Sequence, residues 1–290
     1  MPKFPNNPRV LKAKLVSYET FSGIANSIQL VAFAKLKKLK KKIDNRFVSL
    51  RFVKTLLKNY YAVNVNEVEK SCLVIYFSSD KSCSGSINNP IFNQTIKLIT
   101  DFKAHGNIVS VIPVGKKGFN VFKKKYRREM THRLVDLELD MNYWIASYVL
   151  LEEILKLNFT NCYLIFAQFV NNFMQEIVFC KFPSFNSFFA SIVSDNRDSN
   201  LILDIFLDKN TEDKKYILDF YSFFMSLLLL DSFSESEYSQ LGAKAKTMEL
   251  AIQNVTETIT ILRIRYNKAR QSIITNEIIE VLNATVAILE

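Results

Sequence analysis

Apolar residues recur from Leu241 towards the end of the chain at gaps that alternate four and three. This spacing is the 3.5-residue period of a helix that winds around another helix in a coiled coil. A helix over Leu241–Glu290 would extend about 75 Å, which is longer than a single domain is wide. A core helix of an all-α domain is one interpretation, but a shaft that leaves its own domain and enters another protein fits the length better. The repeating positions are Leu241, Ala245, Met248, Ile252, Val255, Ile259, Leu262, Tyr266, Ala269 and Ile273.

The repeat stops after Ile273, because Asn276 and Glu280 occupy the next two positions. We expect the helix to continue, with its apolar face rotated away from the partner that it contacts earlier. The apolar stripe that resumes one position over consists of Ile274, Ile278, Val281 and Ile288.

A second long helix is predicted near the start of the chain, over residues 11–62, after a basic tail at residues 1–10. Its predicted contact positions with the C-terminal helix are Ile24, Ile28 and Val31, which keep the same spacing. The small residues Ala25, Ala32 and Ala34 would let another helix approach closely. The stretch from Lys35 to Lys42 then places six lysines in eight positions, which is either a solvated helix face or a contact with an acidic surface.

The middle of the chain has a different pattern, with short apolar runs separated by polar turns and helical stretches. We expect a helix that begins at Asn89-Pro90, with Asn89 as its N-cap, and ends at Gly106. Another helix is expected over Met141–Leu157. The runs typical of buried strands are Cys72–Phe77, Asn107–Val114, Cys162–Phe169 and Glu176–Phe182, the last two forming a possible hairpin.

This order predicts an α/β protein in which the N- and C-terminal segments form a long antiparallel two-helix coiled coil. A small, mainly parallel sheet domain is inserted between them at residues 70–210. Within it we expect a peripheral strand and loops over Phe185–Asp213. Helix should resume near Thr211 and run through 211–290, with a possible kink between Ser232 and Gly242.

Composition is that of a folded protein, with 290 residues, 49% hydrophobic and 23% charged, and a formal net charge of +10. The charge suggests an acidic partner, such as nucleic acid, a membrane surface or an acidic protein. No membrane-spanning segment is expected, since the most apolar run, Phe220–Leu230, is about half the length required. The four cysteines form no C-x-x-C pair and two histidines are too few for a histidine metal site, so buried free thiols and no metal are expected.

Three polar motifs are candidate sites for chemistry. The loop SSDKSCSG (residues 78–85) joins a strand to a helix, where α/β proteins often bind phosphate, but it matches neither nucleotide-binding glycine pattern. The turn Gly115–Gly118 (GKKG) could hold a phosphate through its lysines, although such glycines more often only shape a loop. The acids Asp136, Glu138 and Asp140 alternate with apolar residues, as in an edge strand with one solvated face. No active site, and no cofactor, is expected.

A basic cluster on the C-terminal helix is a candidate contact surface. It spans more than half of the helix circumference beside the seam, which suits a helix gripped from several sides by another protein. A solvated face is the alternative. The cluster consists of Arg263, Arg265, Lys268 and Arg270, with Gln271 beside them.

Five segments resemble the gamma subunit of the rotary ATP synthases, and they occur in the order of that family. The strongest is RYNKARQSIITNEIIEVLNA (Arg265–Ala284), which is similar to the family's C-terminal signature at nearly every position. IANSIQLVAFAK (Ile24–Lys35) and YSQLGAKAKTMELAIQN (Tyr238–Asn254) resemble two further helical segments. SDKSCSGSIN (Ser79–Asn88) and GKKGFNVFKK resemble two loops, although Lys81-Ser82 replaces Arg-Gly. The segment Phe182–Asp231 has no clear match.

The resemblance implies a central-stalk rotor, with a Rossmann-like foot domain and no catalytic residues of its own. The implied partners are three alpha and three beta subunits, the delta and epsilon family subunits and the ring of c subunits. The implied location is the matrix side of the mitochondrial inner membrane. Lys35, Arg270 and Gln271 match family residues that touch the surrounding subunits. A basic start without acids, with Lys3, Arg9, Lys12 and Lys14, fits an import signal or a solvated tail.

Two other functions fit parts of the pattern. A basic α/β nucleic-acid-binding protein with a coiled-coil dimerisation arm predicts a homodimer and strongly salt-dependent binding. A small nucleotide-dependent enzyme using the SSDKSCSG loop predicts nucleotide binding by the isolated chain.

Overall fold

The computed structural model divides into two compact units, each described by itself. The helical unit combines Met1–Phe33 with Ala245–Glu290, and the sheet unit is Ala34–Lys244. The structure describes residues 7–56, 71–80, 84–135, 143–171, 175–194 and 214–289.

A four-stranded sheet in the order β2-β1-β3-β4 forms the centre of the sheet unit. The central strand β1 pairs parallel to β2 and to β3, whereas β4 pairs antiparallel to β3 along its whole length. The mainly parallel sheet and the closing hairpin are therefore confirmed. The strands are β1 (Ser71–Phe77), β2 (Ile108–Val114), β3 (Asn161–Phe169) and β4 (Gln175–Pro183).

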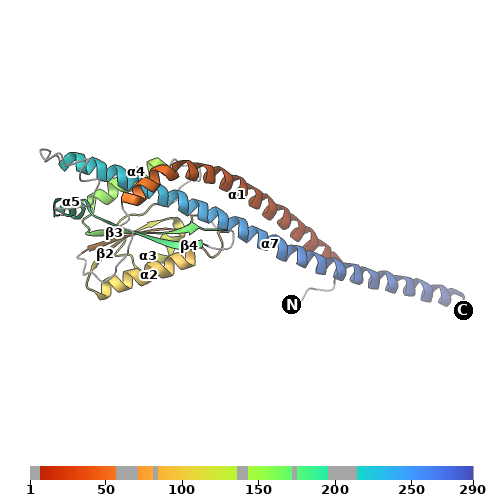
Figure 1. The fold of residues 1–290 in the computed structure, drawn as a ribbon. Helices are drawn as coiled ribbons and strands as arrows, with labels where there is room; N and C mark the ends of the chain where they lie inside the picture. Colours follow the sequence, from red (N-terminus) through yellow and green to blue (C-terminus); the bar gives the residue numbers. More distant parts are fainter. Residues whose placement is uncertain are drawn as a thin grey trace. The chain divides into compact units, whose positions relative to one another are not determined.

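Each face of the sheet carries its own apolar core, since successive side chains of a strand point to opposite faces. Leu73, Ile75 and Phe77 of β1 belong to one core, which α4, α5 and the beginning of α7 cover. Val74 and Tyr76 belong to the other core, beneath α2 and α3 (Figure 1). The helices are α2 (Asn88–Ala104), α3 (Lys116–Lys125), α4 (Tyr143–Lys156), α5 (Phe185–Ser194) and α7 (Lys214–Leu289).

The start of α2 differs from the prediction, because helix begins at Asn88 and Pro90 is its third residue. Asn89, the predicted N-cap, is therefore inside the helix, and Asn88 before it bonds to a loop residue. Its side-chain amide donates to Ser79 Oγ (2.8 Å) and its side-chain oxygen accepts from the Ser79 N–H (3.0 Å). The end of α2 is as predicted: Gly106 has a φ of +78° and its N–H donates to the Lys103 carbonyl at 3.0 Å. A left-handed glycine with this bond pattern closes a helix.

The prediction of a strand and loops after Phe185 is wrong where the structure describes it, because Phe185–Ser194 is the helix α5. Its aromatic and β-branched residues resemble a strand in sequence. Ser184 starts the helix instead, since its hydroxyl accepts from the Ser187 N–H at 3.3 Å. Two ring contacts join α5 to Tyr221 of α7, from Phe185 at 5.6 Å and from Phe188 at 5.5 Å. The predicted acidic edge strand, at Asp136, Glu138 and Asp140, lies outside the described residues.

The helix α7 runs without a break from Lys214 to Leu289, so it is not interrupted between Ser232 and Gly242, where a kink was possible. Between Lys215 and Ile288 it contains an 18-residue window apolar enough to cross a membrane, and 61% of that window is buried in the structure. The apolar stretch of α7 is therefore longer than Phe220–Leu230, the run identified from the sequence. Met225 and Leu229 of this run are buried against the sheet. The run is therefore apolar because it is part of the core of the sheet unit.

The helix α1 (Pro8–Leu56) begins three residues earlier than predicted. Proline is acceptable at the first position of a helix, because the missing N–H would have no partner there. The side chain of Asn7 caps the helix by accepting from the Arg9 N–H at 3.0 Å. The last three residues of the predicted tail are thus helical.

Candidate functional site: the paired helices and the free end of α7

The two long helices pack together in the helical unit through a small apolar cluster. Leu262 of α7 is 0% exposed and lies against Leu11 and Leu15 near the start of α1. Since residues early in α1 meet residues late in α7, the pair is antiparallel. Figure 1 shows the red start of α1 beside the blue part of α7. The partly buried residues around the cluster are Tyr18, Ile259, Tyr266 and Ala269.

The α7 side of the seam lies where the spacing placed it. Met248, Val255 and Leu262 are buried, and Ile252, Ile259 and Tyr266 are partly buried. Ile273, the last residue of the predicted repeat, is exposed. This seam is occupied by α1 of the same chain, so it does not serve as the arm of a homodimer.

The α1 side of the seam differs from the prediction. Ile24 and Val31 are 54% and 56% exposed, whereas Ala25 and Ala32 are 2% exposed. Ile28 is partly buried. The inward face therefore runs one residue further along, through small side chains. An alanine at such a position lets two helix backbones approach, and a bulky side chain would hold them apart.

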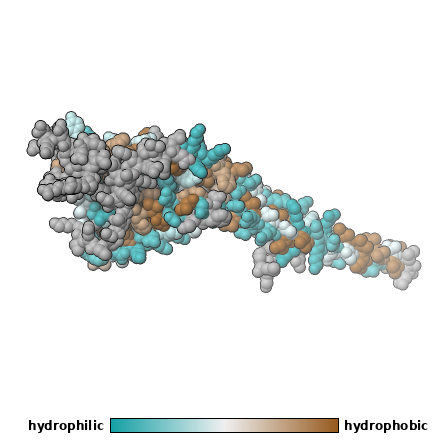
Figure 2. All heavy atoms as spheres, in the orientation of Figure 1, coloured by the Kyte–Doolittle hydropathy of each residue, from teal (hydrophilic) through white to brown (hydrophobic). Residues whose placement is uncertain are grey.

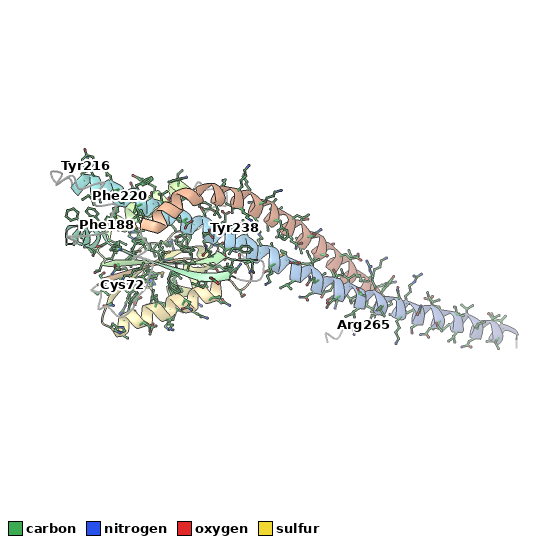
Figure 3. The ribbon with its side chains drawn as sticks, in the orientation of Figure 1. Cys72, Phe188, Tyr216, Phe220, Tyr238 and Arg265 are labelled. Atoms are coloured by element: carbon green, nitrogen blue, oxygen red, sulfur yellow. The ribbon has the colours of Figure 1, made fainter. Side chains whose placement is uncertain are left out.

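The basic cluster is tied to α1 by an ion pair of Arg263. The Arg263 guanidinium donates to the Glu19 carboxylate on α1 at 2.6 Å. Arg265, labelled in Figure 3, is partly buried, and Lys268, Arg270 and Gln271 are exposed. Lys35 of α1 is partly buried and belongs to the sheet unit, not to the same unit as the cluster. Contact of these six residues with other subunits stays a prediction.

Beyond Ala269 the helix α7 continues without α1, and every residue from Arg270 to Ile288 is exposed. Many of these side chains are apolar, and Figure 2 shows the brown residues gathered on the last turns. A soluble surface rarely exposes so much contiguous apolar area unless another molecule covers it. The apolar side chains are not confined to the one predicted stripe, and they comprise Ile273, Ile274, Ile278, Ile279, Val281, Leu282, Val286 and Ile288.

The loop SSDKSCSG and the turn GKKG, the two candidate phosphate sites, are joined to each other by hydrogen bonds. Helix starts at Lys116, so GKKG is the first turn of α3 and not a separate turn. The Lys116 N–H donates to Asp80 Oδ1 (2.7 Å), and the Gly118 N–H donates to Ser78 Oγ (2.9 Å). The Lys117 N–H donates to the Ser79 carbonyl at 3.1 Å. These are the N–H groups that would bind a phosphate at a helix N-terminus, and residues 78–80 already occupy them.

Both glycines of this turn are required by close packing. Gly115 has a φ of +99°, and a Cβ there would lie 2.0 Å from the Ser78 carbonyl oxygen. A Cβ on Gly118 would lie 2.5 Å from Cε2 of Tyr76. The motif is therefore a packing junction between the ends of β1 and β2 and the start of α3.

The remaining candidates for chemistry are dispersed. Cys72, Cys162 and Cys180 are buried free thiols, and Cys83 lies outside the described residues. Burial raises the pKa of the Cys162 thiol well above its usual value, which opposes a nucleophilic role. His132 pairs with Glu153 at 3.1 Å. In the described ranges, no three His, Cys, Asp or Glu side chains come together as metal ligands.

Comparison with known proteins identifies the family. A family model described as ATP synthase matches residues 7–288. The mitochondrial ATP synthase gamma subunit of Trypanosoma brucei brucei is 26% identical over 285 residues, which cover 95% of this chain and 90% of the relative. The ATP synthase gamma chain of Syntrophus aciditrophicus is 24% identical over 291 residues, covering 96% and 97%.

A solved structure has the same fold over nearly the full length. A chain in the mitochondrial ATP synthase of Euglena gracilis superposes with a TM-score of 0.80 at 21% identity, covering 97% of this chain and 94% of that chain. Since the family model matches almost every residue and the full-length relatives are gamma chains, this chain belongs to the gamma-subunit family of the ATP synthases.

Proposed function

We propose that the chain is a central-stalk rotor subunit, which transmits rotation of a membrane ring of c subunits to a catalytic head of three alpha and three beta subunits. The observation that carries this proposal is the free apolar end of α7. An apolar single helix with no partner among the described residues of its own chain fits inside a ring of other subunits. A solved rotor of the Euglena gracilis mitochondrial ATP synthase supports it, with a TM-score of 0.77 over 92% of this chain.

In this proposal the chain acts mechanically and contributes no catalytic side chain. Torque passes through the paired helices, because two packed helices resist bending and twisting together. The sheet unit is the foot, which meets the delta and epsilon family subunits and the ring of c subunits. Contacts to the head are assigned to Lys35, Arg263, Arg265, Lys268, Arg270 and Gln271.

The proposed location is the matrix side of the mitochondrial inner membrane. Two similar proteins, from Trypanosoma brucei brucei and Euglena gracilis, are mitochondrial ATP synthase subunits.

The test removes residues 270–290, which leaves the paired part of α7 intact. The truncated and full-length chains are expressed with an affinity tag in cells that lack the native copy. We expect alpha and beta subunits to co-purify with the full-length chain. We expect coupled ATP synthesis to fall several-fold in the truncated cells.

A matched control exchanges Asn283, an exposed polar residue of the same segment, for Ala, and should leave synthesis unchanged. Purification of the full-length chain without alpha and beta subunits, together with undiminished synthesis after truncation, would refute the rotor function.

A further inference from the structure

A second surface with unusual charge lies in the sheet unit, on α3 and the turn that follows it. We call it the α3 groove. Its volume is about 410 Å³, within the range of sites that hold a peptide side chain or a small ligand. It is lined by Phe119, Lys123, Arg127, Met130, His132 and Arg133.

Cations dominate the segment that forms the groove. Residues 116–133 contain eight lysines and arginines and one acid, Glu129. That acid is paired with Lys103 of α2. A second acid among the described residues, Glu153 of α4, accepts from Lys156 at 2.7 Å and meets His132 at 3.1 Å. Both acids are therefore already engaged.

Three cations line the groove without a paired acid among the described residues. The Arg133 guanidinium lies 4.6 Å from the centroid of the Phe119 ring, and Lys123 Nζ lies 5.6 Å from it. In the described part of the chain, no carboxylate lies within ion-pair distance of Lys123, Arg127 or Arg133. Like charges held this close repel one another, and an anion between them would relieve that repulsion.

Backbone hydrogen bonds hold the turn in place along the free edge of β2. The Val111 N–H donates to the Glu129 carbonyl (2.8 Å), and the Thr131 N–H donates to the Val111 carbonyl (3.2 Å). Further on, the Leu134 N–H donates to the Pro113 carbonyl at 3.0 Å. The groove is thus built before any ligand arrives, which lowers the entropy lost on binding.

We propose that the α3 groove binds an acidic polypeptide segment of a partner protein. Its carboxylates would pair with Lys123, Arg127 and Arg133, and an apolar side chain between them would lie on Phe119 and Met130. The groove lies in the sheet unit, which the proposed function makes the foot, and it shares no residue with the contacts assigned to the head.

Two other anionic partners fit less well. A bilayer presents a flat layer of head groups, whereas this surface is concave and has an apolar floor. A nucleic-acid base would need to stack on an aromatic face. The Arg133 guanidinium already lies over the ring of Phe119, which is the aromatic side chain of the groove.

The test measures the anisotropy of a fluorescent peptide of alternating Glu and Leu, titrated with the full-length chain. One variant reverses the groove cations, Lys123→Glu, Arg127→Glu and Arg133→Glu. The control variant reverses three exposed lysines elsewhere, Lys12→Glu, Lys97→Glu and Lys215→Glu, and has the same net charge. We expect Kd to rise about tenfold or more in the groove variant and less than about twofold in the control.

Three results would overturn the proposal. The wild-type chain could fail to bind the peptide, or both variants could weaken binding equally. Phosphatidylcholine–cardiolipin vesicles or single-stranded DNA could also bind through the same cations more tightly than the peptide does. If circular dichroism shows that the triple reversal does not fold, the neutral pair Arg127→Gln and Arg133→Gln replaces it, with the same expected direction.

Discussion

Arg263 on α7 and Glu19 on α1 are joined by an ion pair of 2.6 Å, although 244 residues separate them in the chain. Both side chains are largely exposed, so the pair is worth under about 1 kcal/mol. The pair marks the register of the two helices, since it joins one turn of α1 to one turn of α7.

Reversing one partner should disturb this register and reversing both should restore it. We expect Glu19→Arg to lower the free energy of unfolding by roughly 0.5–1 kcal/mol, because like charges then meet. The double variant Glu19→Arg with Arg263→Glu should recover most of that loss. Urea unfolding followed by circular dichroism measures both. An equal loss in the double variant would show that the pair does not act as described.

Alanines, not the larger apolar residues beside them, should control helix pairing. We expect Ala25→Leu or Ala32→Leu to destabilise the protein by about 1–3 kcal/mol, because the added atoms have no room. The neighbours Ile24→Ala and Val31→Ala should change stability of the isolated chain by less than about 0.5 kcal/mol. The midpoints of urea unfolding compare the stability of the four variants directly. A larger loss in Ile24→Ala and Val31→Ala than in the two alanine variants would support the seam predicted from the sequence.

Two glycines should respond in opposite directions to the same substitution. In Gly118→Ala the new Cβ would meet the Tyr76 ring and Ser78 Oγ, so we expect a loss of about 2 kcal/mol or more. Gly23 has nothing within 4 Å of the same added atom and lies inside α1. Gly23→Ala should therefore stabilise by roughly 0.5–1 kcal/mol. Thermal unfolding of the two variants against wild type is the measurement.

Two buried tyrosines offer a similar contrast. The Tyr221 hydroxyl donates to the Pro183 carbonyl at 2.8 Å, so Tyr221→Phe should cost about 1–2 kcal/mol by leaving that acceptor unpaired. The Tyr76 hydroxyl is buried without a partner among the described residues. Burial also raises the pKa of the Tyr76 phenol, so the group stays neutral. Tyr76→Phe should therefore be neutral or stabilising, and a loss comparable to that of Tyr221→Phe would contradict this.

The ion pair between Glu129 and Lys103 should give stability that disappears in acid. Partial burial opposes ionisation of Glu129, but the Lys103 hydrogen bond, a backbone hydrogen bond and the charges of Lys103 and Arg128 together outweigh it and hold the pKa of that carboxyl below its usual value. Because the folded-state pKa is the lower one, the contribution is complete above the unfolded-state pKa and is lost as pH falls through the folded-state pKa. The stability difference between wild type and Glu129→Gln should shrink over that acidic range. A difference independent of pH would refute the pair.

Sequence patterns predicted the sheet well, because each strand is a short apolar run closed by polar residues. The predicted Cys72–Phe77 differs from β1 by one residue. The α1 seam was misplaced for a physical reason. Hydrophobicity selects large residues such as Ile24 and Val31, whereas close helix packing selects Ala25 and Ala32.

Contacts between residues far apart in the chain could not be predicted from the sequence. Nothing in SSDKSCSG or GKKG alone indicates that Ser78 and Asp80 bind the first turn of α3. The helix α5 was missed because its aromatic residues suit a strand equally well, and the only local signal was Ser184 in an N-cap position. The α3 groove was missed because its cations gather only once residues 129–134 lie along β2.

The unaccompanied end of α7 has a mechanical consequence. Two helices pinned by Leu262 and its neighbours resist twisting as a pair, but past Ala269 one helix alone carries the load. The exposed stretch is about 30 Å long at the rise of an α-helix. Under a torque applied at the end of α7, these last turns would twist before the paired helices do. Elastic energy would therefore be stored there and released to the protein that encloses them.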